Sequence, residues 1–209
     1  MFPVSFRSLV LVCAFLWLFL FTGAIWEAYP FLAVSHPVGG DVLILEGWVP
    51  TYTLDQAATA FRNGHYRKLL IIRSFDVDNH SSKSIVKTLL RHGLPSEALE
   101  MVYHPAPRKD RTYHMALAAR DWLAEHEAPV KAIDVVTLGP HARRSRLTFE
   151  KAFGNTTAVG VIALDDETYD PHHWWRTSEG VGETLGEAIK WVYARFFFFA
   201  FVGDVYDRP

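Results

Sequence analysis

The sequence predicts an α/β protein: a Rossmann-like, open, mostly parallel sheet with helices on both faces, preceded by one N-terminal transmembrane helix. Two observations carry this prediction. Five short apolar runs alternate with segments whose apolar residues recur every three or four positions, the rhythm of βαβ units. Before them, the uncharged stretch "LVLVCAFLWLFLFTGAIW", Leu9 to Trp26, is long enough to cross a bilayer as a helix.

The N-terminal stretch is predicted to be an uncleaved anchor. A cleaved signal peptide is the alternative, but it has a shorter apolar region and a small-x-small site, of which Thr22-Gly23-Ala24 is a poor version. Arg7 precedes the apolar run and Glu27 follows it, so the positive-inside tendency places the N-terminus in the cytoplasm. We therefore expect a single-pass membrane protein whose folded domain is extracytoplasmic.

The chain divides into an anchor (1–30), a connector (31–40) and an α/β domain (41–209). Apolar runs predict strands, and apolar residues at helical spacing predict the helices between them. The predicted strands lie at 41–47, 68–74, 99–105, 132–139 and 158–164. The predicted helices lie at 54–63, 82–92, 112–126 and 142–153, with glycines at 64, 93 and 154 where three of them should stop.

A last helix is predicted to begin at Asp170-Pro171 and to break near Gly180 and Gly182. It runs into the apolar segment "RFFFFAFVG" at 195–203, which is too short to span a membrane. We expect this segment to pack on the sheet. The alternative is a patch lying on the bilayer, with Lys190 and Arg195 near the head groups.

Composition limits the classes of function. Half of the 209 residues are hydrophobic, which suits one domain with a real core. A net charge of -2 argues against a nucleic-acid partner, which would need a basic surplus. The only cysteine, Cys13, lies in the apolar run, so the domain is expected to form no disulfide.

Candidate site residues follow from topology, because ligands of open α/β sheets bind beyond the carboxyl ends of the strands. Polar groups follow four of the predicted strands and should face one crevice. They are Glu46, Gly47 and Trp48, then Arg73, Ser74 and Asp76, then Lys109 to Tyr113 with Arg111 and Thr112, and finally Gly139 to Arg144 with His141.

The fourth turn, "VVTLGPHARRSRLTFEKAFG", is the most specific signal. His141 and Arg144 lie three apart at a helix N-terminus, which itself attracts anions. We therefore expect an anion there. Arg143 and Arg146 are expected to lie on a solvated face, one of them paired with Glu150.

Other positions of the crevice suggest supporting roles. Arg111 is a second cation at a helix start, whereas Asp110 and Thr112 are explained by capping. Glu46 is either the first solvated residue after its strand or an acid that faces the crevice. No GxGxxG or P-loop occurs, and "DPHHW" is better explained by capping than by a metal site, so no cofactor is identified.

These motifs resemble the DUF218 or YdcF-like family, of the SanA and ElyC type that carries a membrane anchor. The fourth turn is similar to the family's "VTS..H..RA", "RTYHMALAARDWL" to its "nTyeNA" helix, and the opening strand and helix to its "vVLGgg" segment. The resemblance covers about 41–164. It carries Glu46, Gly47, Ser74, Thr112, Tyr113, Thr137, His141 and Arg144 over as site positions.

The resemblance implies an inner-membrane protein of the bacterial cell envelope, linked to peptidoglycan or to lipid-carrier polysaccharide metabolism. It also raises S-adenosylmethionine binding, the activity associated with YdcF, although the family's glycine-rich first turn reads Glu46-Gly47-Trp48 here.

Two functions remain open at this stage. In the first, the domain binds an anionic small molecule or lipid-linked sugar: Arg144 and Arg111 hold the anion, His141 transfers a proton and Glu46 is its partner acid or base. In the second, the domain is a non-catalytic scaffold that contacts an envelope protein.

Overall fold

One all-parallel sheet of five strands organises the domain in a computed structural model, which describes residues 6–75, 79–105, 108–127 and 129–198. The strands lie within a residue or two of the predicted runs. They are β1 (Val42–Glu46), β2 (Lys68–Ser74), β3 (Leu99–His104), β4 (Ala132–Leu138) and β5 (Ala158–Leu164). Their order, β3-β2-β1-β4-β5, reverses direction between β1 and β4, so a crevice is expected where these two strands end.

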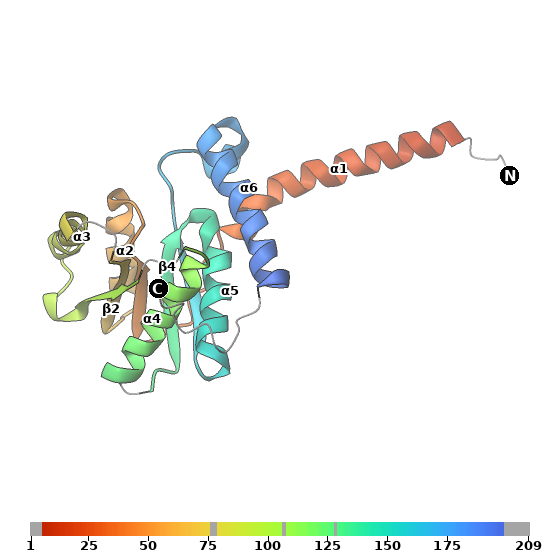
Figure 1. The fold of residues 1–209 in the computed structure, drawn as a ribbon. Helices are drawn as coiled ribbons and strands as arrows, with labels where there is room; N and C mark the ends of the chain where they lie inside the picture. Colours follow the sequence, from red (N-terminus) through yellow and green to blue (C-terminus); the bar gives the residue numbers. More distant parts are fainter. Residues whose placement is uncertain (1–5, 76–78, 106–107, 128, 199–209) are drawn as a thin grey trace.

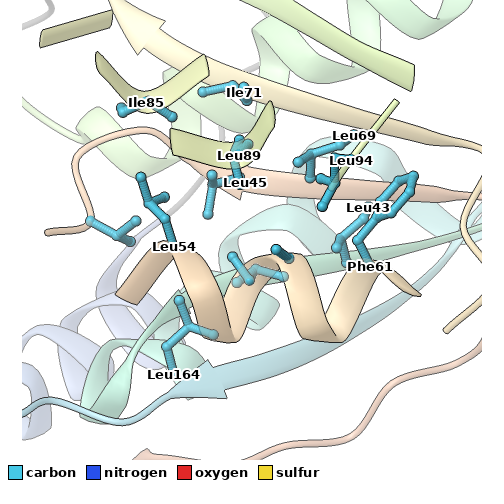
Figure 2. Close-up of a cluster of buried hydrophobic side chains, with 14 of the residues drawn as sticks. Leu43, Leu45, Leu54, Phe61, Leu69, Ile71, Ile85, Leu89, Leu94 and Leu164 are labelled. Carbon is cyan, nitrogen blue, oxygen red and sulfur yellow. The ribbon is translucent and has the colours of Figure 1, made fainter. Parts of the chain in front are cut away.

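Helices cover both faces of the sheet, as predicted (Figure 1). They are α2 (Leu54–Asn63), α3 (Asn79–Arg91), α4 (Arg111–His126) and α5 (Ala142–Phe153). Alternate residues of β1 point to opposite faces: Leu43 and Leu45 join the core under α2 and α3 (Figure 2), and Val42 and Ile44 join the core under α4 and α5. β1 is buried on both faces, which explains its uninterrupted apolar run.

The connector is fixed to the amino edge of the sheet by a buried carboxylate. Asp134 of β4 accepts hydrogen bonds from the backbone N–H groups of Val38 (2.7 Å), Gly39 (3.0 Å) and Gly40 (3.3 Å). The Tyr66 hydroxyl donates a fourth at 2.8 Å. This carboxylate therefore orders the chain that enters the domain.

The helix α1 (Phe6–Leu32) is, by length and composition, the one helix of the described residues that could cross a membrane. It runs two residues beyond the predicted anchor, and its last turns belong to the domain. Tyr29 and Leu32 are buried, and the Tyr29 ring lies edge-on to that of Tyr169, with 6.1 Å between the centroids. In Figure 1, α1 leaves the domain beside α6 (Ser178–Val192) and extends away from it.

The break in the last helical segment falls earlier than predicted. Asp170 caps a 3-10 helix, Pro171–Arg176, and Thr177 is extended before α6 begins. Thr177 Oγ1 accepts from the N–H of Gly180 at 3.1 Å, so the threonine ends one helix and caps the next. Gly180 does not break α6, but a Cβ there would collide with the Trp174 carbonyl. A π-helical turn, Tyr193–Phe197, continues α6.

Candidate functional site

A cleft of about 870 Å³ opens at the carboxyl edge of the sheet. Its walls come from the ends of β1 and β2, the first turns of α4 and α5, and one side of α6. The site residues predicted from the sequence that line it include Gly47, Arg73, Ser74, Arg111, Thr112, Tyr113, His141 and Arg144. Glu46 and Thr137 lie behind them, and Asp76 is outside the described residues.

Glu46 is a fully buried acid at the end of β1, so it is not the solvated residue of the first alternative. It does not line the cleft either, as the second alternative expects, but lies behind His141. Its carboxylate accepts hydrogen bonds from Thr137 Oγ1 at 2.5 Å, Ser145 Oγ at 2.7 Å and Trp48 Nε1 at 3.0 Å. Its Oε2 also lies 3.2 Å from His141 Nε2. The strands β1 and β4 are neighbours, so the topology alone brings Glu46 beside Thr137 and the turn that follows it.

His141 lies between two carboxylates. Its Nε2 faces Glu46, and its Nδ1 lies 3.2 Å from Oε1 of Glu187, a buried residue of α6. An imidazolium with a proton on each nitrogen can donate to both acids, whereas a neutral ring with its proton on Nε2 donates to Glu46 and can accept at Nδ1 from Arg144 Nη2, 2.8 Å away. The Trp48 ring covers His141 edge-on, with 4.8 Å between ring centroids.

Arg144 is held by the same acid. Its Nε donates to Glu187 Oε2 at 2.7 Å and its Nη2 to Oε1 at 3.2 Å, a bidentate pair. Its Nη1 donates to Thr112 Oγ1 at 3.0 Å. Lys190, one turn along α6, lies 3.0 Å from Glu187 Oε1. The Glu187 carboxylate therefore occupies the position at which the basic turn predicts an anion.

The network sets the protonation states of its members. Burial alone raises the pKa of Glu46, but the charge of His141 and the hydrogen bonds from His141, Thr137 and Ser145 outweigh it and hold the pKa below its ordinary value. The same balance, with hydrogen bonds from His141 and Arg144, holds the pKa of Glu187 well below its ordinary value.

The histidine shifts in the opposite direction. Burial and the Arg144 charge lower the pKa of His141, yet the charge of Glu46 and the hydrogen bonds to both carboxylates raise it above its ordinary value overall. His141 is therefore favoured as a cation, and its protonation decides the local charge. With Glu46, Glu187, Arg144 and Lys190, the cluster is neutral when His141 is neutral and carries one positive charge when it is protonated.

Beyond this cluster the cleft remains basic. Four further Lys or Arg side chains line it, against two further Asp or Glu. Arg108, Lys109 and Arg111 contribute cations from the start of α4, and all three are exposed to solvent. An anionic ligand would therefore meet free cations at the mouth before it met the paired cations at the floor.

The turn after β1, at Gly47, is packed against the side chain of Arg73. Arg73 is buried, its Nη1 donates to the Gly47 carbonyl at 2.7 Å, and a Cβ on Gly47 would collide with the Arg73 side chain. Glycine is required at 47 for packing against Arg73, so this turn does not offer the open backbone with which dinucleotide folds approach a ligand. Next to it, the buried Ser74 Oγ has no hydrogen-bond partner among the described residues.

Two sequence interpretations need correction here. Thr112 does not cap α4, because its hydroxyl is bound to Arg144, and Asp110 takes the N-cap position in a left-handed conformation (φ 51°) without a side-chain cap. Arg143 does not lie on a solvated face as expected: its guanidinium lies 3.9 Å from the centroid of the Phe31 ring and donates to the Phe31 carbonyl. The expected pair of Arg146 with Glu150 is confirmed at 2.9 Å.

Sequence reasoning missed Glu187 and gave no role to Ser145 or Trp48. Glu187 lies 43 positions from Arg144 and reaches it only because α6 folds back over the cleft. The one local signal is the spacing of Glu179, Glu183, Glu187 and Lys190, which places all four charged residues of α6 along one side of the helix.

Comparison with known proteins adds no relative: no family model, no curated protein and no solved structure matches this chain. Within the described part of the chain, no group of three or more His, Cys, Asp or Glu side chains could hold a metal ion.

Proposed function

We propose that this protein is a membrane-anchored domain that binds an anionic ligand, a phosphorylated or lipid-linked sugar intermediate of the bacterial cell envelope. The observation that carries the proposal is the excess of cations in the cleft at the β1–β4 switch point. Proximity to α1 supports a ligand that is itself bound to the membrane. Membership of the DUF218 or YdcF-like family is part of the same proposal, supported by the motif order.

Each residue has a role in this proposal. Arg111 and Lys109 capture the anion at the mouth. Glu187 occupies the inner position, where Arg144, His141 and Lys190 converge on one carboxylate. A phosphate that displaces Glu187 gains the same three partners, and His141 is then released at Nδ1 to exchange a proton with the ligand. Glu46 acts as a positioning residue, because it holds Nε2 from behind and does not line the cleft.

Ligand-induced stabilisation tests the proposal. The full chain should be used, since a fragment that begins after α1 would lack the buried Tyr29 and Leu32. Thermal unfolding is measured in detergent with a short-chain polyprenyl phosphate, the matching polyprenol, sugar nucleotides, inorganic phosphate and S-adenosylmethionine. A ligand that binds only the folded state raises the Tm. We expect a rise with the polyprenyl phosphate and none with the uncharged polyprenol.

Charge variants connect that rise to the cleft. Lys109→Ala combined with Arg111→Ala removes two exposed cations, and we expect ligand affinity to fall by roughly tenfold, about 1.4 kcal/mol. Arg91→Ala, an exposed arginine of α3, is the matched control and should bind like wild type. Equal responses to phosphate and alcohol, or a double variant that binds normally, would favour the scaffold function. A response to S-adenosylmethionine alone would favour the methyl-donor alternative.

A further inference from the structure

The outer side of α6 is an apolar surface that no other element covers in the described structure. Four residues of α6 and its π-helical extension define this surface, here named the α6 face: Leu185, Ile189, Val192 and Phe196, which are 47%, 72%, 42% and 59% exposed. They recur at intervals of four, three and four residues, so they share one side of the helix. Ser178 and Gly182 continue the same spacing, and no charged residue falls on it.

The opposite side of the same helix is buried. Gly180, Thr184 and Glu187 face the domain and the cleft. Lys151 of α5 donates to the backbone carbonyls of Ala194 (2.6 Å) and Phe198 (2.8 Å), which fixes the end of the π-helical turn against the domain. The α6 face is therefore directed outward by a rigid attachment.

The position of α1 indicates what lies against this face. From Leu9 to Trp26 there are eighteen residues, which rise about 27 Å as a helix and so nearly match a bilayer core. Contacts with the domain begin at the same level: Trp174 Nε1 donates to the Ile25 carbonyl at 3.3 Å, and the rings of Trp26 and Trp175 are 4.8 Å apart. No spacer separates the apolar run from the domain, and Figure 1 shows α6 at the point where α1 leaves it.

Aromatic and basic residues around the α6 face are those typical of a membrane interface. Trp191 of α6 packs edge-on against Phe31 of α1, with 5.0 Å between the ring centroids. Tyr193, Phe197 and Arg195 are exposed beside the face. Tryptophan and tyrosine favour the head-group level, and arginine reaches anionic head groups.

We propose that the α6 face lies in the interfacial layer of the bilayer that α1 spans, with its apolar side chains at the boundary between head groups and acyl chains. This inference rests on α1 being a membrane anchor, as in the proposed function. The domain is then held against the membrane at two places. Because Glu187, Lys190 and Tyr193 of the same segment line the cleft, the wall between cleft and lipid is only one helix thick.

Spin-label accessibility in lipid nanodiscs tests the proposal on the full chain. In a Cys13→Ser background, single cysteines replace Ile189 or Phe196 on the α6 face. Two controls carry a single cysteine elsewhere: at Leu16 within α1, and at Lys87, an exposed residue of α3. Collision with oxygen reports lipid, and collision with a water-soluble nickel chelate reports solvent. We expect the oxygen-to-nickel ratio at positions 189 and 196 to exceed that at position 87 several-fold and to approach that at position 16.

The labels separate the possible failures. A lipid-like ratio at position 16 with a water-like ratio at 189 and 196 would overturn the α6 inference and leave the anchor intact. A water-like ratio at position 16 would overturn the anchor and the inference together. Low collision with both reagents at 189 and 196, with two chains in each disc by mass measurement, would show that a second copy covers the face and would also overturn the inference. A soluble anionic ligand that still stabilises the protein would show that the cleft binds independently of this face.

Discussion

The two ends of the sheet each bury a carboxylate, and they bury it differently. At the amino edge, Asp134 receives three backbone N–H groups and a tyrosine hydroxyl, none of which is charged. At the carboxyl edge, Glu46 and Glu187 share His141, and Glu187 also binds Arg144 and Lys190. Asp134 and Glu46 are fully buried, and Glu187 is 2% exposed.

This difference in partners distinguishes a carboxylate with a structural role, Asp134, from carboxylates whose partners can change their charge or pairing, Glu46 and Glu187. Backbone donors are fixed in place and do not titrate, so Asp134 is held in one state that orders the connector. His141 can gain and lose a proton, with its pKa raised above the ordinary value, and Arg144 and Lys190 have side chains that can be re-paired. Since His141, Arg144 and Glu187 also line the cleft, the carboxyl edge can respond to a ligand and the amino edge cannot.

Asp134→Ala should have the largest effect on stability. It leaves three backbone N–H groups and the Tyr66 hydroxyl without their acceptor, and we expect a loss of about 3–5 kcal/mol in the free energy of unfolding. Denaturant unfolding of the full chain in detergent measures this loss. Asp134→Asn keeps one acceptor oxygen in the same volume and should lose less.

The comparison also predicts what Asp134 variants leave unchanged. In the fraction of Asp134→Asn that folds, ligand affinity at the cleft should equal that of wild type, because the two carboxylates lie at opposite ends of β4 and β1. A change in affinity at constant fold would show that the two edges are coupled, and this distinction between the carboxylates would be wrong.

The titratable groups at the carboxyl edge should make the free energy of unfolding depend on pH. The pKa of His141 is raised, so its contribution is complete below about 6.5 and is lost as pH rises through the folded-state value. The pKa values of Glu46 and Glu187 are lowered, so their contributions are complete above about 4.5 and are lost as pH falls through the folded-state values. The free energy of unfolding should therefore be greatest between about pH 4.5 and 6.5 and should decline as the pH rises above about 6.5.

The variant Glu187→Gln tests the contribution of Glu187 to this pH dependence. The amide removes the negative charge beside His141 Nδ1, so the pKa of His141 should fall and the decline in stability above pH 6.5 should become shallower. We expect a loss of about 1–3 kcal/mol in the free energy of unfolding at pH 6, less than for Asp134→Ala because the site borders the cleft. Unfolding curves between pH 5 and 9 give both values. An alkaline decline as steep as in wild type would mean that Glu187 does not control His141.

The contrast between local and distant interactions also explains what the sequence could predict. The apolar runs of β1 to β5 and the helical spacing of α2, α4 and α5 are properties of neighbouring residues, and all of these elements are confirmed. Glu46, His141 and Arg144 were predicted because topology brings strand ends together. Glu187 was missed because its partner lies 43 positions away and depends on how α6 packs.

The errors have the same origin. Thr112 is a good capping residue by type, but the arginine that binds its hydroxyl comes from another helix, and so the local prediction fails. The break at Thr177 was placed at the glycines because their flexibility is a local property, whereas the need for a glycine at 180 comes from the Trp174 carbonyl.

The smallest effect should come from an ion pair on the surface, that of Arg146 with Glu150. Arg146 pairs with Glu150 one turn along α5 at 2.9 Å, and their side chains are 36% and 43% exposed. Water screens such a pair, so Arg146→Ala should cost at most about 0.5 kcal/mol, with unchanged pH dependence and unchanged ligand affinity. Arg146 and Arg144 belong to the same basic turn and differ mainly in burial and in what they face. If Arg146→Ala weakened binding as much as the Lys109 and Arg111 double variant, affinity would depend on the total charge of the basic turn and not on which side chains line the cleft. That result would contradict the role that the proposed function gives to the buried network.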